Sequence, residues 1–277
     1  MLDDPIVIVG AARTPMGGFQ GSLSAVSAPE LGGVAIKSAL ERAGVPAQDV
    51  AEVIMGLCLF AGVRQAPARQ AAHNAGVPWS SGATTISKMC GSAMKSAMLA
   101  HDNILAGSAE VMIAGGMESM TNAPYVLPKA RNGYRLGAGD VVQDHMFMDG
   151  LEDAYDQGKL MGSYAEDCAE HYQFTREAQD AYAIESLTRA KKAVEDGTFK
   201  PEIEAVTVKT RKGETVVDSD EQPFNANIDK IPQLKPAFRK GGTVTPANSS
   251  SISDGAAALV LMRRSEAEKR GLTPKAI

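Results

Sequence analysis

Short runs of β-branched and apolar residues alternate with helical segments through the N-terminal part of the chain. The strand-like runs cover residues 6–9, 53–55, 84–86 and 111–114. Capping residues and apolar residues at helical spacing predict helices between them. Ser27 and Glu30 form a capping box for a helix that runs to Gly44, and a second helix covers residues 66–75. This alternation indicates an α/β layer fold with a largely parallel sheet.

From about Thr121 the pattern changes. Thr175 is expected to cap a long helix that ends near Gly197, and residues 206–217 form a predicted hairpin around residues 211–213. The proline-rich stretch 224–236 is expected to be extended, and residues 256–262 form another buried strand. We therefore predict an α/β domain made of residues 1–120 and 246–277, interrupted by an inserted α+β region at 121–245.

Composition excludes several classes of protein. The chain has 277 residues, of which 44% are hydrophobic and 22% charged, as in an ordinary globular protein. Its net charge of −5 implies no general affinity for nucleic acid or anionic membranes. The three cysteines show neither a disulfide framework nor a metal-ligand pattern, which fits a reducing compartment. The acidic start is unlike a signal peptide, and no apolar run spans a bilayer, so we expect a cytoplasmic protein.

Cys90 is the candidate for chemistry. It follows the predicted strand at 84–86, which we expect to be buried, and precedes a helix that Gly107 ends. Free amides and the positive end of the helix dipole stabilise an anion at such a place, and the thiolate is the nucleophilic form of cysteine. The alternative is a small buried hydrophobic residue. Cys58 and Cys168 are expected to be packing residues, and His145 to be structural or exposed.

Several stretches, taken in order, resemble the thiolase family, the acyl-CoA C-acyltransferases. They are residues 13–23 (RTPMGGFQGSL), 67–71 (PARQA), 84–95 (TTISKMCGSAMK), 114–124 (AGGMESMTNAP), 242–245 (GTVT) and 253–258 (SDGAAA). Each motif is weak by itself, whereas the ordered set is specific and spans the whole chain.

The resemblance implies a thiolase N-terminal half, with a five-stranded mixed sheet and an inserted CoA-binding loop domain at 121–245. It implies that Cys90 is the nucleophile, that Glu118 orients the loop beside it, and that the substrate is a coenzyme A thioester. No separate cofactor or metal is expected. By resemblance, the residues that contact the CoA substrate are Leu151, Met161, Ser250 and Ile252. A homo-oligomer, dimer or tetramer, is implied for the full-length protein, with a place in fatty acid metabolism and no nucleic-acid or membrane partner.

The sequence departs from the family in two respects. The motifs that supply an asparagine, a histidine and a second cysteine from the family's second half do not occur, so we expect the C-terminal thiolase domain to be absent from this chain and the isolated chain to be inactive. Leu160 stands where short-chain members carry histidine, which favours longer acyl chains. Two alternatives are a related condensing enzyme of the ketoacyl synthase type, and a non-catalytic CoA-binding or scaffold half-thiolase.

Overall fold

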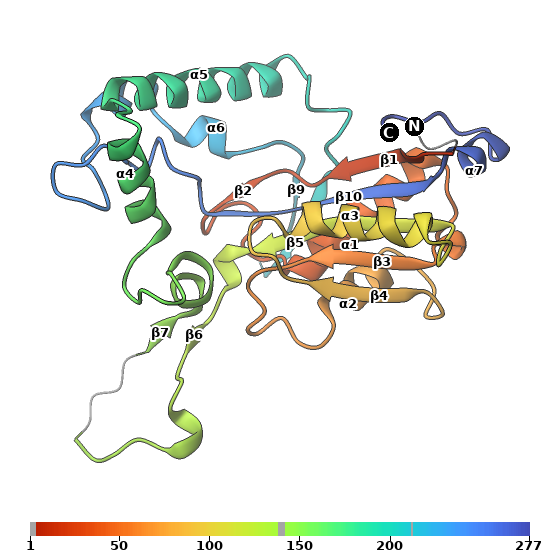
Figure 1. Cartoon of the computed structure of the whole chain (residues 1–277), viewed down its shortest axis with the longest axis horizontal. Helices are drawn as coiled ribbons and strands as arrows, with labels where there is room; N and C mark the ends of the chain where they lie inside the picture. Colours follow the sequence, from red (N-terminus) through yellow and green to blue (C-terminus); the bar gives the residue numbers. More distant parts are fainter. Residues whose placement is uncertain (1–3, 138–141, 212) are drawn as a thin grey trace.

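A mixed sheet forms the centre of the computed structural model, which describes residues 4–137, 142–211 and 213–277 (Figure 1). Its strands lie in the order β1-β10-β5-β3-β4, and β2 pairs with β10 at one end. Their bounds are β1 Ile6–Arg13, β2 Gly17–Gly18, β3 Glu52–Gly56, β4 Gly82–Ile86, β5 Val111–Ser119 and β10 Ser253–Arg263.

The strand directions correct one expectation. β3 runs parallel to β4 and β5, as alternating strands and helices predict, but β10 runs antiparallel to both β1 and β5. The prediction of a largely parallel sheet was therefore wrong. The alternation of neighbouring strands and helices does not predict the direction of a strand, such as β10, that returns to the sheet after the insertion. The mixed sheet that the family resemblance implies is confirmed.

Helices cover both faces of the sheet. The helices α1 (Ala28–Ala43) and α2 (Pro67–Asn74) pack on one face, and α3 (Ser92–Leu105) packs on the other. Alternation along the strands matches this arrangement, since Val53 and Met55 face α1 and α2 whereas Ile54 faces α3. The predicted capping box is present at α1, where the Ser27 N–H donates to the Glu30 carboxylate at 2.8 Å.

The strand β4 lies at the edge of the sheet and is not buried as predicted. Thr84 is exposed, and Thr85 and Ile86 are half-buried. β-branched composition indicates a strand without distinguishing an edge position from a central one. One side of α3 also stays open, because Met94 is 73% exposed and Met98 53% exposed.

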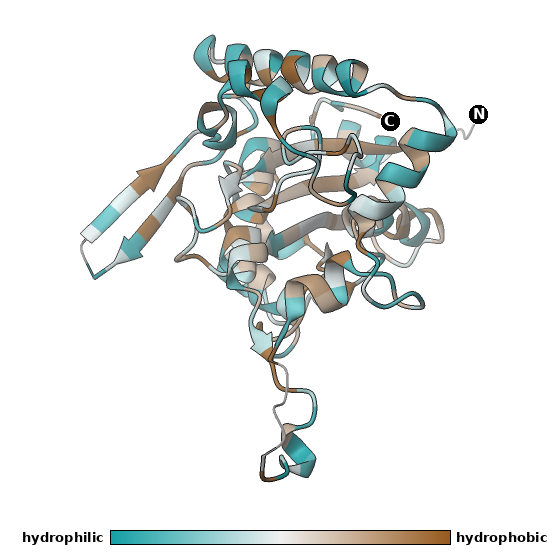
Figure 2. Cartoon of the chain, turned by 90° about the vertical axis from the view of Figure 1, so that its left-hand side faces the viewer, coloured by the Kyte–Doolittle hydropathy of each residue, from teal (hydrophilic) through white to brown (hydrophobic). Residues whose placement is uncertain are grey.

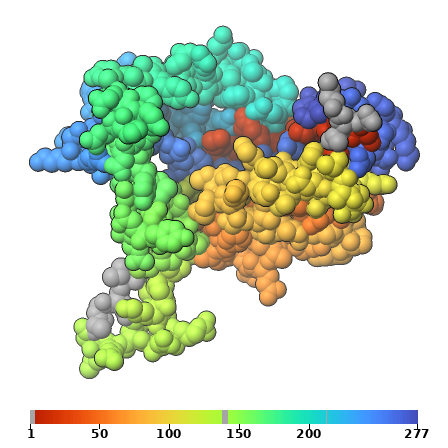
Figure 3. Space-filling view, in the orientation of Figure 1, coloured from red at the N-terminus to blue at the C-terminus, as the bar shows by residue number. Residues whose placement is uncertain are grey.

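The inserted region wraps around one end of the sheet. Two short elements lie outside the insertion, η1 Ala47–Asp49 and α7 Arg264–Lys269. The elements from the end of β5 through the insertion are η2 Met120–Asn122, β6 Tyr125–Val126, η3 Ala130–Asn132, β7 Gln143–Asp144, the π-helix η4 Met146–Leu151, α4 Met161–His171, α5 Arg176–Glu195, β8 Val206–Thr210, β9 Gly213–Val217, α6 Gln222–Asn225 and η5 Ile228–Gln233. Residues 125–137, in yellow-green, project from the body of the molecule (Figure 3).

Several predictions for the insertion can be compared with these elements. The Thr175 hydroxyl caps α5 by accepting from the Ala178 N–H at 3.1 Å, as expected. Strands β8 and β9 form the predicted hairpin, although Lys212 in its turn lies outside the described residues. The stretch 224–236 is not extended throughout, because Asn227 caps the short helix η5 by accepting from the Asp229 N–H.

Hydropathy follows the layers. In Figure 2 the central strands are mostly apolar, whereas α5 carries many hydrophilic residues along its length. Within the described ranges, no helix combines the length and apolar character needed to cross a membrane.

Close packing between β1 and α1 yields a prediction about stability. A Cβ atom on Gly10 would lie 2.4 Å from the Ala39 carbonyl oxygen of α1, and a backbone atom cannot easily move away. We expect Gly10→Ala to lower the free energy of unfolding by about 1–3 kcal/mol, measured by urea denaturation. Gly255→Ala is the matched control, since its Cβ would lie 3.5 Å from the Thr14 hydroxyl, an ordinary contact. Equal losses in the two variants would contradict the packing argument.

Candidate active site

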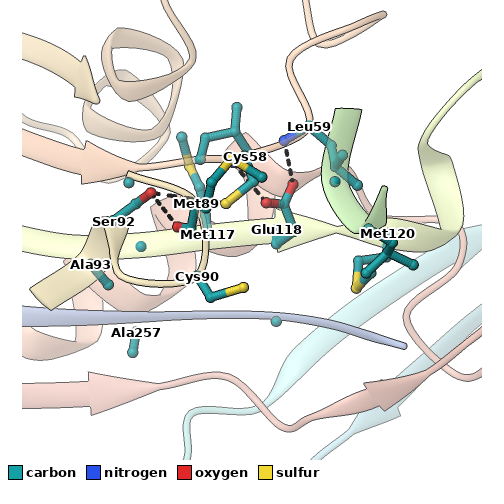
Figure 4. A pocket seen from close by; sticks show the side chains of 16 residues that line it. Cys58, Leu59, Met89, Cys90, Ser92, Ala93, Met117, Glu118, Met120 and Ala257 are labelled. Atoms are coloured by element: carbon teal, nitrogen blue, oxygen red, sulfur yellow. Dashed lines mark hydrogen bonds between the residues drawn. The ribbon is translucent and has the colours of Figure 1, made fainter. Parts of the chain in front are cut away.

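A largely apolar cavity of about 320 Å³ lies where β3 and β5 end, beside the turn that leads into α3 (Figure 4). Five segments far apart in the sequence contribute to its lining. The lining residues are Gly56, Leu57, Cys58, Leu59, Met89, Cys90, Ser92, Ala93, Gly116, Met117, Glu118, Met120, Gly150, Leu151, Gly255 and Ala257.

Cys90 sits on the turn between β4 and α3, as the sequence predicts. The turn is held by the Gly91 N–H, which donates to the Lys88 carbonyl at 3.2 Å, and by the Ser92 hydroxyl, which accepts from the Lys88 N–H at 2.8 Å. Gly91 is the N-cap residue of α3, and Cys90 is exposed. The alternative of a small buried hydrophobic residue is therefore wrong.

Two glycines allow the start of α3 to approach the sheet closely. A Cβ atom on Gly56 would lie 2.6 Å from the Ser92 Cβ, and one on Gly116 would lie 2.7 Å from the Ala93 Cβ. Both distances are too short for real side chains. The first turn of α3 therefore rests directly on β3 and β5, and this contact fixes Cys90 at the rim of the cavity.

Glu118 extends from β5 into the cavity wall. Its carboxylate accepts from the Cys58 N–H at 2.8 Å and from the Leu59 N–H at 3.4 Å. Burial raises the pKa of Glu118, and these hydrogen bonds only partly oppose the effect. Glu118 therefore holds the segment after β3 in place.

Cys58 lines the same cavity, whereas its local sequence predicts only a packing residue. Its Sγ lies 3.9 Å from the Ser92 Oγ. Burial raises the pKa of the Cys58 thiol to about 11, and the negative charge of Glu118 adds to this effect. Cys58 is therefore a neutral thiol at neutral pH. Nothing in its local sequence signals this position, because its neighbours come from β5 and α3.

His145 connects the insertion to the segment after β3, so the expectation of a structural role is confirmed. Its Nδ1 lies 2.6 Å from the Asp149 Oδ2, and its Nε2 accepts from the Ala61 N–H at 3.2 Å. Accepting at Nε2 places the ring proton on Nδ1, which donates to Asp149. The available signal was the spacing of four between His145 and Asp149, which places both on one helical face.

The structure brings together only some of the expected substrate-binding residues. Leu151 joins Cys90 and Glu118 at the cavity, whereas Ser250 lines a separate cavity of about 730 Å³ between α5, α6 and the segment before β10. Met161 and Ile252 line neither of these two cavities. Among the described residues, no group of three or more His, Cys, Asp or Glu side chains is placed to hold a metal ion.

This fold and cavity define an α/β protein with an exposed cysteine at the N-terminus of a helix, and its relatives identify the family. Residues 6–265 match the family described as "Thiolase, N-terminal domain". The chain belongs to the thiolase family and corresponds to its N-terminal region. The family assignment also sets aside the ketoacyl synthase alternative.

Individual relatives are longer than this chain. An "Acetyl-CoA acetyltransferase" of Cupriavidus necator is 50% identical over 273 residues, which are 98% of this chain and 69% of that protein. One from Schizosaccharomyces pombe is 46% identical over 278 residues, covering 100% of this chain and 70% of the relative. The solved structure of an acetyl-CoA acetyltransferase from Syntrophomonas wolfei superposes with a TM-score of 0.92 at 42% identity, covering 98% of this chain and 68% of that one.

The raised pKa of Glu118 yields a prediction about pH. Because the folded chain holds this proton more tightly than the unfolded chain, stability falls as pH rises from the usual glutamate pKa of about 4.3 through the raised folded-state value. Glu118→Gln removes this titration but keeps an oxygen that accepts from the Cys58 N–H. We expect the Tm of the variant relative to wild type to increase as the pH rises above about 4.3.

Glu110→Gln controls for the loss of one carboxylate, since Glu110 is an exposed residue next to the same strand. Differential scanning calorimetry across the pH series gives the measurement. If the Tm difference between Glu118→Gln and wild type does not change with pH, burial does not favour the protonated Glu118 carboxyl.

Proposed function

We propose that this chain carries the acyl-accepting step of an acyl-CoA C-acyltransferase, with Cys90 as the nucleophile. The observation that supports it most directly is the exposed Cys90 thiol at the rim of an apolar cavity large enough for an acyl group. The names of the relatives, acetyl-CoA acetyltransferases, support acetyl-CoA as a substrate in place of the longer acyl chains that Leu160 favours. Coenzyme A thioesters serve as substrates here, with no further cofactor.

In this mechanism the Cys90 thiolate attacks the thioester carbonyl carbon. The carbonyl oxygen becomes an oxyanion, to which we assign the Cys90 backbone N–H as donor, and the coenzyme A thiolate then leaves. The product is an acyl group bound to Cys90 as a thioester. The acyl chain lies against the apolar wall, where Leu151 faces it from the insertion.

We propose a division of the chain at the two points where the sheet is interrupted. We assign residues 1–120 and 246–277 to the α/β domain and residues 121–245 to a CoA-binding loop domain, since β5 ends at Ser119 and β10 begins at Ser253. Ser250, at the larger second cavity, is the proposed contact for the pantetheine arm. Met161 and Ile252 complete the proposed substrate contacts outside these cavities.

Condensation or thiolysis of a 3-ketoacyl-CoA needs an additional base for proton transfer. No histidine follows His171 in this sequence, so we propose that the 277-residue chain by itself forms the acyl-enzyme without turning over. The competing function, a non-catalytic CoA-binding or scaffold half-thiolase, predicts no acyl-enzyme at all.

The exposed apolar face of α3 supports a proposal about assembly. Met94, Met98 and Leu105 lie on this helix with 73%, 53% and 39% of their surface exposed. Large exposed apolar surfaces mark contact sites between proteins. We propose that the second half of a full-length thiolase covers this face, and, from the family resemblance, that the full-length protein forms a homo-oligomer in a reducing compartment such as the cytoplasm.

Thiol reactivity gives a first test. We expect limiting iodoacetamide at neutral pH to label Cys90 before Cys58, because Cys58 is half-buried and its raised pKa keeps it protonated. Peptide mapping by mass spectrometry measures the order. Preferential labelling of Cys58 in the folded chain would remove Cys90 from its proposed role.

Acyl transfer gives the direct test. Incubation with acetyl-CoA should leave an acetyl group on Cys90 that hydroxylamine removes, and Cys90→Ala should abolish it. Cys168→Ser, an exposed cysteine in α4, is the matched control and should be acetylated like wild type. Steady-state thiolysis of acetoacetyl-CoA by the chain should be at least about a hundredfold below the rate expected with a catalytic base present. Absence of the acetyl group from folded wild-type chain would favour the scaffold alternative.

A further inference from the structure

Two of the three cysteines border one cavity. Cys58 follows β3 and Cys90 precedes α3, and Figure 4 shows both side chains in the cavity lining, with Glu118 on the same wall. Both thiols are free in the structure. Cys168 is exposed in α4 and does not line this cavity.

The sheet places the two segments side by side. β3 and β4 pair in parallel, and beyond their ends the Leu57 N–H donates to the Ile86 carbonyl at 3.1 Å. Cys58 follows Leu57 and lies against the start of α3, where its Sγ is 3.9 Å from the Ser92 Oγ. Cys90 lies on the turn before α3, two residues before Ser92, and its charge influences the pKa of Cys58, so the two thiols are neighbours in the cavity lining.

The backbone of the turn that carries Cys90 is held by hydrogen bonds and by the close contact of α3 with the sheet, so only the Cys90 side chain is free to rotate. Met89 has a φ of 47°, in the left-handed region that residues with a Cβ rarely adopt. Cys90 itself is exposed, so its side chain can change rotamer without displacing a packed neighbour. A change of the Cys90 rotamer moves its sulfur along the cavity lining without any movement of the backbone.

The two thiols differ in the way that a redox pair requires. Cys90 is open to solvent and to small oxidants. Cys58 is half-buried beside Glu118, which keeps it protonated and slow to react with an oxidant directly. Oxidation therefore begins at Cys90, and Cys58 remains available as an intact thiol.

We propose that Cys58 is the resolving partner of Cys90 and that hydrogen peroxide converts the pair to a reversible disulfide. In the first step the Cys90 sulfur attacks peroxide, so that a sulfur–oxygen bond forms, the oxygen–oxygen bond breaks, and hydroxide leaves to become water. In the second step the Cys58 sulfur attacks the Cys90 sulfenic acid. The sulfur–sulfur bond forms, the sulfur–oxygen bond breaks, and the hydroxyl group leaves as water with the proton from the Cys58 thiol.

Glu118 is placed to take that proton first. Its carboxylate interacts with the Cys58 thiol as well as with the Cys58 N–H. The complete reaction consumes one peroxide and two thiols and produces one disulfide and two waters. A dithiol reductant reverses it. The consequence is a blocked nucleophile that is protected from irreversible oxidation to sulfinic acid.

The experiment treats the reduced 277-residue chain with stoichiometric hydrogen peroxide at neutral pH, blocks the remaining thiols, and maps peptides by mass spectrometry. We expect an intact mass lower by two hydrogen atoms, a linked peptide pair containing Cys58 and Cys90, and recovery of both thiols with dithiothreitol. Cys168→Ser should give the same linkage. Because no coenzyme A is present, failure here is distinguishable from failure of the acetyl-transfer test.

The Cys58→Ser variant supplies the contrast, with Cys58→Ala as a second variant and circular dichroism to confirm folding. Without the resolving thiol, we expect Cys90 sulfenic acid that dimedone traps, followed by sulfinic acid, and no loss of two hydrogens. If the wild-type chain gives the same sulfenic and sulfinic products as these variants, Cys58 does not form a disulfide with Cys90 and the proposal is overturned. A disulfide that joins Cys90 to Cys168, or that forms only between chains, also overturns the proposal.

Discussion

The pairing of β10 with β5 is the constraint on which the rest of the structure depends. β10 comes from the end of the chain, yet it lies between β1 and β5 and closes the centre of the sheet. Asp254 pairs with Ser119 at the point where the insertion leaves the sheet and returns to it. The buried Asp254 carboxylate accepts from the Thr121 N–H at 3.0 Å and from the Ser119 hydroxyl at 3.3 Å. Both ends of the insertion are thereby fixed beside the cavity.

The pairing of β10 with β5 also determines which residues line the cavity beside Cys90. Gly255 and Ala257 of β10 and Met117 and Glu118 of β5 share one cavity because the two strands are in register. The insertion adds Gly150 and Leu151 through η4, a π-helix of a kind that often occurs at functional sites. The bond from the Ala61 N–H to His145 then holds the insertion against the segment after β3. The cavity is therefore a product of long-range pairing rather than of any single motif.

The difference between local motifs and long-range pairing explains which features the sequence could predict. The strand, turn and helix around Cys90 follow from local signals, as do the capping box at Ser27 and the helix that Thr175 caps. Strand direction could not be predicted from alternation, because the antiparallel neighbour of β5 lies beyond the insertion. The place of Cys58 in the cavity and the bond from Ala61 to His145 could not be predicted for the same reason, because the partners, Ser92 and Ala61, are distant in sequence.

The shared wall of Cys58 and Glu118 explains how one cavity can hold two thiols with different chemistry. Burial disfavours the charged form of both groups, and a negative charge on either one disfavours ionisation of the other. The Glu118 carboxylate is stabilised by N–H donors from Cys58 and Leu59, whereas the Ser92 hydroxyl is the group that offsets burial of the Cys58 thiol. The charge therefore resides on Glu118 and the proton on Cys58. Because this partition depends on backbone donors after β3, the same hydrogen bonds that shape the cavity also keep its second thiol from competing with Cys90.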